Sequence, residues 1–170
     1  MQRRNGQLLF SPSDLNRYLE SPFVSWMDRL HLEMPGTVVP DEDSETNKLL
    51  QKKGLDHEYR FLQELRNQGK DVIDVSSAPD QFAATLTAMQ AGHDVIYQGA
   101  LSDGQFAGYS DFLIKTEGQS NFGAYSYEPW DTKLAQKSKT YFLVQLACYA
   151  DLLRVAQGVL PRRMHVALGN

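Results

Sequence analysis

The 170-residue chain contains one cysteine, Cys148, and this scarcity excludes several classes of protein. A disulfide framework, a four-cysteine iron–sulfur cluster and a cysteine-rich zinc module all need more than one cysteine. The same scarcity predicts a reducing, cytoplasmic compartment. A chain of this length buries roughly 70% of the surface that its unfolded form exposes, so we expect it to fold without disulfides or a structural metal.

Long apolar runs are absent as well. No window approaches the roughly 18 uninterrupted apolar residues that a membrane-spanning helix needs. The first ten residues contain only the short apolar run Leu8-Leu9-Phe10 after two arginines. Neither a membrane span nor a signal peptide is therefore predicted. With 42% apolar and 22% charged residues, the composition is that of an ordinary soluble globular domain.

The net charge is −4, but the charges are distributed unevenly along the chain. Residues 31–132 carry seventeen acidic and seven basic side chains, whereas residues 133–170 carry one acidic and six basic side chains. A solvated surface accounts for this pattern as well as a functional site does. The sharper hypothesis is an acidic site that binds a cation beside a basic surface that binds an anion.

Apolar periodicity predicts an α/β domain. Helices are expected from Pro12, with Ser11 as N-cap, and over residues 46–68, 78–91 and 138–157. Strands are expected over residues 72–75, 95–101, 106–115, 124–132 and 164–169. The middle three strands form a meander with an exposed turn at 116–123, and residues 35–45 form an irregular acidic connection. Residues 1–45 are expected to pack on a core of residues 46–170, and the strand at the very end predicts a longer parent protein.

Three side chains on the expected strands are candidates for chemistry. Asp111 lies within the second strand of the meander, between apolar or small neighbours. Asp131 and Lys133 end the third strand, two residues apart and therefore on one face. Two acids and a lysine on adjacent strands can bind a hard divalent cation and hold an anion or a water beside it. The simpler interpretation of Asp131 and Lys133 is a same-face ion pair.

Two helices carry further candidates. The run Gly54-Leu55-Asp56-His57-Glu58 adds His57 and Glu58 as ligands, and Gly54 would let a backbone or a phosphate approach the helix. On the last helix, Gln145 and Tyr149 are four residues apart and share a face. Each has a structural alternative, because a lone histidine is more often a surface or core residue, and Tyr149 and Gln145 also suit core and boundary positions.

Taken together and in order, these motifs resemble the four-part signature of RecB-type nucleases in the PD-(D/E)XK superfamily. The motifs are Gly54-x-x-His57-Glu58, Gly108-x-x-Asp111, Asp131-x-Lys133 and Gln145-Leu146-x-x-Tyr149. The resemblance extends over residues 54–169, and the chain is similar to the N-terminal nuclease domain of RecB-family proteins that are often linked to helicases. It implies a restriction-endonuclease-like core, a mixed central sheet flanked by helices in the order helix, three strands, helix, strand.

The resemblance also implies a metal site and its ligands. Asp111 and Asp131 would bind Mg²⁺ or Mn²⁺, together with His57 and the main-chain carbonyl of Thr132. Glu58 would be an adjacent acid that some members of the superfamily use instead of the histidine. No iron–sulfur cluster is expected, since relatives that carry one have a cysteine after the first helix, where this chain has Glu20-Ser21-Pro22.

The remaining motif residues are implied to act on the substrate. Lys133 would orient or activate the attacking water and stabilise charge on the phosphorane, while Gln145 and Tyr149 would support the lysine or contact the nucleic-acid backbone. Lys137 and Lys139 belong to the basic C-terminal part, which could follow the phosphates with salt-dependent affinity.

The implied function is Mg²⁺-dependent hydrolysis of DNA, by an exonuclease that works beside a helicase in repair or recombination. Two alternatives remain open. One is a catalytically inactive nucleic-acid-binding or scaffolding module with the same fold. The other is an unrelated α/β binding domain in which Asp131 and Lys133 form a surface ion pair, which would leave Asp111 buried without a reason.

Overall fold

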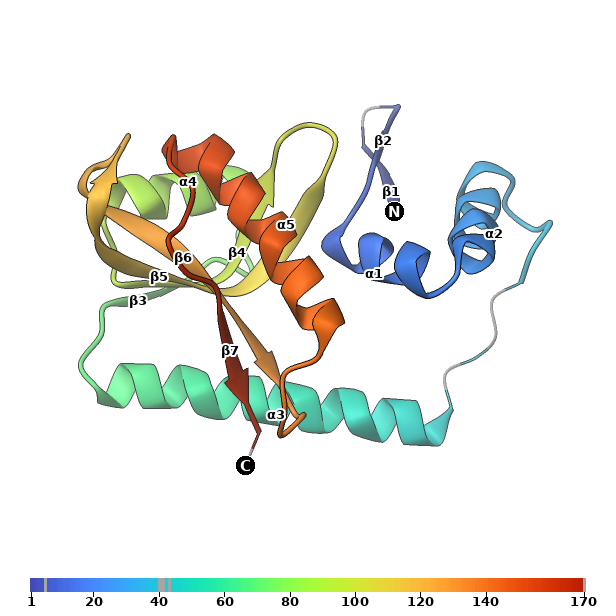
Figure 1. Cartoon of the computed structure of the whole chain (residues 1–170), viewed down its shortest axis with the longest axis horizontal. Helices are drawn as coiled ribbons and strands as arrows, with labels where there is room; N and C mark the ends of the chain where they lie inside the picture. Colours follow the sequence, from blue (N-terminus) through green and yellow to red (C-terminus); the bar gives the residue numbers. More distant parts are fainter. Residues whose placement is uncertain (5, 40–41, 43, 170) are drawn as a thin grey trace.

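A computed structural model of the chain describes residues 1–4, 6–39, 42 and 44–169. Its centre is a five-stranded sheet of order β3-β4-β5-β6-β7. The strands are β3 (Val72–Asp74), β4 (Val95–Ser102), β5 (Ala107–Ser120), β6 (Gly123–Lys133) and β7 (His165–Leu168). The middle strands are antiparallel, whereas β3 and β7 run parallel to β4 and β6 at the edges (Figure 1). The predicted α/β class with a mixed sheet and a central meander is confirmed.

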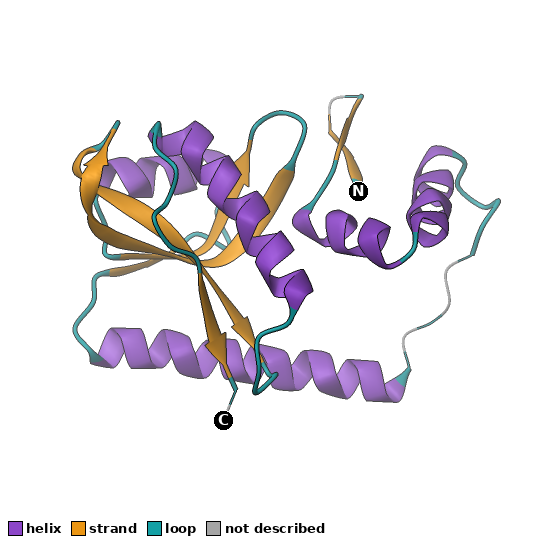
Figure 2. Cartoon of the chain, in the orientation of Figure 1, coloured by secondary structure: helices purple, strands orange, loops and turns teal. Residues whose placement is uncertain are grey.

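Helices cover both faces of this sheet (Figure 2). The described part of the chain forms α1 (Pro12–Glu20), α2 (Pro22–Glu33), α3 (Glu45–Asn67), α4 (Gln81–Ala91) and α5 (Thr140–Gln157). Leu62 and Leu65 of α3 pack in one apolar cluster with Val95, whereas Ile96 belongs to a second cluster built on α4 and α5. Because successive strand residues point to opposite faces, α3 lies on one face and α4 and α5 lie on the other. In this described part no helix has the length and apolarity to span a membrane.

Two features at the N-terminus were missed by the sequence predictions. The strands β1 (Gln2–Arg4) and β2 (Gln7–Leu9) pair in an antiparallel arrangement, and they are too short and polar to give a periodic signal. Helix α2 begins at Pro22 after the N-cap Ser21, whose side chain accepts a hydrogen bond from the amide of Val24. This Ser-Pro start repeats that of α1 and could have been recognised.

Other boundaries differ from the predictions. The turn expected at 116–123 is wrong over most of its length, because β5 continues to Ser120 and pairs there with Gly123 of β6. Antiparallel strands pair through hydrogen bonds between backbone groups, which do not depend on the type of side chain. Polar residues can therefore extend this hairpin. Helix α4 starts at Gln81 and not at Ala78, because Asp80 caps it. In the acidic connection, positions 40, 41 and 43 lie outside the described residues.

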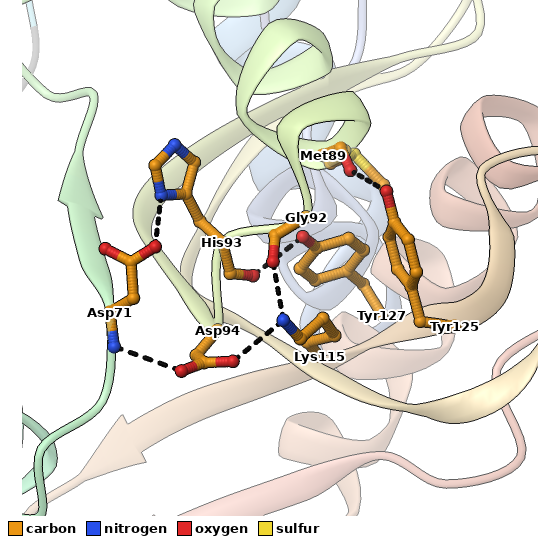
Figure 3. A network of polar contacts seen from close by, with 8 residues as sticks. All are labelled: Asp71, Met89, Gly92, His93, Asp94, Lys115, Tyr125 and Tyr127. Atoms are coloured by element: carbon orange, nitrogen blue, oxygen red, sulfur yellow. Dashed lines mark hydrogen bonds and ion pairs between the residues drawn. The ribbon is translucent and has the colours of Figure 1, made fainter.

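A polar network holds the C-terminal end of α4 against the sheet (Figure 3). Lys115 of β5 donates to the carbonyl of Gly92 and forms an ion pair of 2.8 Å with Asp94. The hydroxyl groups of Tyr125 and Tyr127 donate to carbonyl oxygens in and just after the last turn. The last carbonyls of a helix have no partner within it, so these bonds satisfy them. The hydrogen bond from Lys115 also holds the pKa of Asp94 below its usual value.

The segment before α1 is bound to the edge of the β4–β5 hairpin. The amide of Phe10 donates to the carbonyl of Gln105, and its own carbonyl accepts from Ala107 at 2.8 Å. Pro12 follows so closely that a Cβ atom at Gly108 would lie 2.7 Å from its Cδ. Glycine at 108 is therefore what allows the N-terminal segment to pack directly on β5.

Candidate functional site

The strands β5 and β6 separate where the predicted site residues lie. Their pairing ends at Phe112 and Trp130, beyond which β5 stays with β4 while β6 pairs with β7. Figure 1 shows the β4–β5 hairpin and the β6–β7 pair diverging from this point. The separation removes the backbone partners that the two strands would otherwise offer each other, so side chains have to satisfy these groups.

Asp111 occupies this split. Its Oδ2 accepts hydrogen bonds from both the amide and the hydroxyl of Thr132, each at 2.8 Å. The neighbouring Ser110, which is fully buried, donates from Oγ to the carbonyl of Phe112 at 3.1 Å. Side chains of β5 therefore replace the missing ladder, and the carboxylate of Asp111 is fixed beside the end of β6.

Asp131 lies next to it and is only 1% exposed. Its Oδ2 is 2.6 Å from Nζ of Lys133, yet no group in the described chain meets this oxygen in hydrogen-bond geometry. Burial, and then the charge of Asp111, raise the pKa of Asp131 to about 7, although Lys133 opposes the shift. Two adjacent carboxyl groups, of which Asp131 is buried and Asp111 half-buried, cannot both ionise cheaply, so this pair favours uptake of a proton or a cation.

Glu58 of α3 interacts electrostatically with Asp111 and Lys133. It is 7% exposed, and Nε2 of Gln98 donates to its Oε1. Burial and then the charge of Asp111 raise the pKa of Glu58, while hydrogen bonds and the charge of Lys133 lower it. Glu58, Asp111, Asp131 and Lys133 therefore interact electrostatically as one cluster, called the carboxylate site below.

His57 and Thr132, the other predicted metal ligands, lie at the β6–β7 end of this site. Nε2 of His57 is 3.1 Å from the carbonyl oxygen of Ala167, the residue that pairs with Thr132. The amide and hydroxyl of Thr132 are both used by Asp111. Among the described residues, no group of three or more His, Cys, Asp or Glu side chains is arranged as a metal centre. The site therefore offers two adjacent carboxylates, not a complete ligand cage.

Gln145 and Tyr149 reach the site from α5. Tyr149 is 4% exposed, and its hydroxyl donates to the carbonyl oxygen of Tyr109. Burial raises the pKa of Tyr149; a hydrogen bond with Gln145 opposes this shift, and the charges of Asp111 and Asp131 add to it. The phenol is thus a buried hydrogen-bonding group close to the two carboxylates.

Lys137 and Lys139 precede α5 and are exposed. Lys139 is the N-cap residue of α5 but makes no side-chain cap bond, and its Nζ lies 5.7 Å from the ring centre of Tyr141. Nζ of Lys133 lies 5.6 Å from the ring centre of Phe142, in the first turn of the same helix. The start of α5 therefore borders the carboxylate site, with two solvent-exposed lysines beside it.

The sequence predictions missed Tyr97 and Gln98, which both bond Glu58. Gln98 has φ +56°, the one positive value at a non-glycine position in the described chain. Its carbonyl accepts a bond of 2.8 Å from Gln81 of α4, which helps to hold this conformation. A left-handed residue within a strand redirects its side chain and stores backbone strain. Val95 to Leu101 gives no sign of it, because the run has the composition of a regular strand.

Comparisons of the chain with protein-family models, with curated proteins and with solved structures found no match. The chemistry of the carboxylate site is therefore the basis on which a function can be inferred. That site combines an acidic pair with one buried member, a neighbouring lysine and a third acid with a raised pKa.

Proposed function

We propose that this chain is a metal-dependent nuclease domain of the RecB type, with the PD-(D/E)XK fold, that hydrolyses phosphodiester bonds of DNA. The observation that supports this best is the convergence of Glu58, Asp111, Asp131 and Lys133 at the split between β5 and β6. These residues come from three elements that are far apart in the sequence. A surface ion pair does not account for the arrangement, because Asp131 is 1% exposed and faces a second acid.

The topology is consistent with that fold. A long helix, α3, precedes the sheet, the meander β4–β5–β6 carries the two aspartates, and α5 leads to β7 parallel to β6. The meander therefore presents Asp111 and Asp131 on adjacent strands, and the parallel strand β7 supports the end of β6 that holds Lys133.

The donor set fits a hard divalent cation. Protein sites for Mg²⁺ commonly use one or two carboxylates and leave several positions to water. Asp111 and Asp131 supply the two carboxylates, and the buried Oδ2 of Asp131 meets Nζ of Lys133 at 2.6 Å but not in hydrogen-bond geometry. The main-chain carbonyl of Thr132 and the ring of His57 are the remaining candidates. When bound, Mg²⁺ or Mn²⁺ makes a water more acidic and offsets negative charge on the phosphate.

The side chains of the chain itself have separate tasks in such a reaction. Lys133, held by Asp131 and by the ring of Phe142, provides a fixed positive charge for the phosphorane oxygens. Glu58, whose pKa is raised, is suited to hold a proton near the attacking water. The exposed lysines before α5 would bind the flanking phosphates without regard to sequence.

The test is cleavage of end-labelled DNA, single-stranded and double-stranded, in Mg²⁺, in Mn²⁺ and in EDTA. We expect metal-dependent cleavage that Asp131→Asn abolishes while the fold and DNA binding persist. Asp56→Asn is the matched control, since Asp56 is exposed on α3. A wild-type chain that binds DNA but cleaves none of these substrates in either metal would favour a non-catalytic module. Equal cleavage by Asp131→Asn and wild type would exclude the carboxylate site.

We also propose that the domain acts in DNA repair or recombination, beside a helicase in the same longer chain. This context follows from the resemblance of the four motifs alone. Sequencing of the genomic region that encodes the chain tests it, since helicase motifs downstream in the same reading frame are the expected result.

A further inference from the structure

Strand β4 interrupts its side-chain alternation at Gln98. Ile96 belongs to the apolar cluster of α4 and α5, so in a regular strand Gln98, two residues later, would face the same two helices. Its side-chain amide instead donates to Glu58 of α3, on the other face of the sheet. Tyr97 also bonds Glu58, so two successive residues of β4 reach the same helix.

After Gln98 the alternation continues, shifted by one residue. A Cβ atom at Gly99 would lie 2.7 Å from Cδ1 of Leu113 and 3.5 Å from Cγ2 of Thr85, so position 99 faces α4. Leu101, two residues later, again belongs to the cluster of α4 and α5. The backbone of Gln98 is therefore the point at which β4 changes the face to which each of its positions points.

The irregularity includes Asp111 on the neighbouring strand. In the described register, β4 and β5 pair on both sides of Gln98 and Asp111, but these two residues do not pair with each other. Burial, and then the charge of Asp111, raise the pKa of Glu58, so the two carboxyl groups lie near each other. Gln98 thus lies opposite one acid of the carboxylate site and is bonded to another.

Helix α4 holds this irregular part of β4 in place. Nε2 of Gln81, the first residue of α4, donates to the carbonyl of Gln98 at 2.8 Å. The hydroxyl of Thr85, which is 1% exposed, accepts the amide of Ala100 at 2.9 Å and donates to the carbonyl of Gln81 at 2.7 Å. A left-handed conformation is unfavourable for a residue with a side chain and persists only where its surroundings hold it.

We propose that Gln81 is a positioning residue of the carboxylate site. It holds the left-handed backbone of Gln98, whose side-chain amide then fixes Glu58 from the other face of the sheet. The inference rests on the proposed nuclease function for its effect on cleavage and adds a residue of α4 to that site. Capping of α4 does not explain the contact, because Asp80 already accepts a backbone amide of the first turn.

The first experiment measures the contact itself, in the metal-free protein. Gln81→Met keeps the length of the side chain and removes its donor, and Gln90→Met, at the exposed far end of α4, is the matched control. A ¹H–¹⁵N spectrum shows the side-chain amides, and the signal lost in Gln98→Ala identifies Gln98. In the wild type its protons should exchange with water about tenfold more slowly than those of exposed glutamines, because they are bonded to a buried carboxylate. Gln81→Met should remove this protection, and Gln90→Met should keep it.

The second experiment is single-turnover cleavage of DNA in Mg²⁺. Gln81→Met should lower the maximal rate about fivefold and leave the half-saturating DNA concentration unchanged, because Glu58 is given no part in holding the DNA. In a Gln98→Ala background the same change should cause no further loss, since Gln81 acts through that amide. A merely structural role for Gln81 would make the two losses of rate multiply.

Unchanged exchange at Gln98 in the Gln81→Met protein, or losses of rate that multiply, would overturn the proposal. Gln81→Ala also removes the donor and gives the same comparison should Gln81→Met fail to fold. Rapid exchange at Gln98 in the wild type would overturn the proposal without any variant of Gln81. Wild-type cleavage in Mg²⁺ or Mn²⁺ tests the nuclease function separately. If the chain cleaves no DNA, the exchange comparison alone decides whether Gln81 positions the site.

Discussion

Thr132 donates both its amide and its hydroxyl hydrogen to one oxygen of Asp111, at 2.8 Å each. The contact joins β6 to β5 at the place where the two strands stop pairing. One threonine thus fixes the half-buried carboxylate of Asp111, whereas Oδ2 of the buried Asp131 has Lys133 as its ion-pair partner at 2.6 Å.

Thr132→Val should loosen this contact without changing the shape of the side chain much. It removes the hydroxyl bond to Asp111 and keeps the amide bond, so we expect a loss of about 1 kcal/mol in the free energy of unfolding. Binding of Mn²⁺ should also weaken, because Asp111 is less well oriented. Urea unfolding and Mn²⁺ titration measure both effects. Thr87→Val on α4 is the control, since Thr87 is exposed and bonds only its own helix within the described contacts. Unchanged Mn²⁺ affinity in Thr132→Val would contradict a positioning role.

Asp131→Asn should stabilise the metal-free protein at alkaline pH. The pKa of Asp131 is raised from its usual 3.8 to about 7, mainly by burial and by Asp111. Its contribution to stability is therefore fully present below the unfolded pKa and is lost as the pH rises through about 7. Asparagine carries no charge to bury, so the gain over wild type should be larger at pH 8 than at pH 5.

Urea unfolding in EDTA at the two pH values measures this gain. Asp111 and Lys133 face Asp131, and Lys133 loses its ion-pair partner in the variant, which reduces the gain at both pH values. Asp56→Asn, in which an exposed acid is replaced, should show no such pH dependence. An Asp131→Asn protein that is less stable than wild type at pH 8 would mean that the ion pair outweighs the burial of charge.

At Gln98, a side chain that bonds Glu58 is carried by a backbone with a positive φ, so substitutions should separate the effect of the strain from the effect of the bond. Glycine adopts this φ of +56° at a lower conformational free energy than other residues do, so Gln98→Gly should be more stable than Gln98→Ala by about 1 kcal/mol. Both variants lose the bond to Glu58, so both should lower the cleavage rate to a similar degree. Thermal unfolding and single-turnover cleavage separate the two effects. If Gln98→Gly cleaved at the wild-type rate while Gln98→Ala did not, the conformation and not the amide would be what matters.

Tyr149→Phe should reduce stability and disturb β5 at the same time. The hydroxyl is buried and donates to the carbonyl of Tyr109, which would be left without this partner. We expect a loss on the order of 1 kcal/mol in the free energy of unfolding, measured by urea titration. Tyr141→Phe is the control, because Tyr141 is 45% exposed near the start of α5. A Tyr149→Phe protein with wild-type stability but slower cleavage would assign the phenol to the substrate instead.

Several elements follow from short-range signals in the sequence. Ser11 and Pro12 begin α1 where predicted, and Gly92 and Gly158 end α4 and α5 with φ +76° each. These signals are local, since a cap or a left-handed glycine acts within one turn of its own helix. The meander and its mixed sheet were predictable for a similar reason, because β-branched and aromatic runs with short turns favour neighbouring antiparallel strands.

The arrangement of the candidate site was decided by the tertiary structure. The sequence alone indicated which residues have useful chemistry, Asp111, Asp131 and Lys133 among them. It contained no signal that Asp111 bonds a threonine 21 residues away, or that Gln98 turns left-handed to reach Glu58, 40 residues before it. Those contacts arise only when β5 and β6 separate and α3 packs across the sheet. Side-chain alternation determines which residues share a face of a strand, but packing between distant elements determines which buried carboxylates meet and how far their pKa values shift.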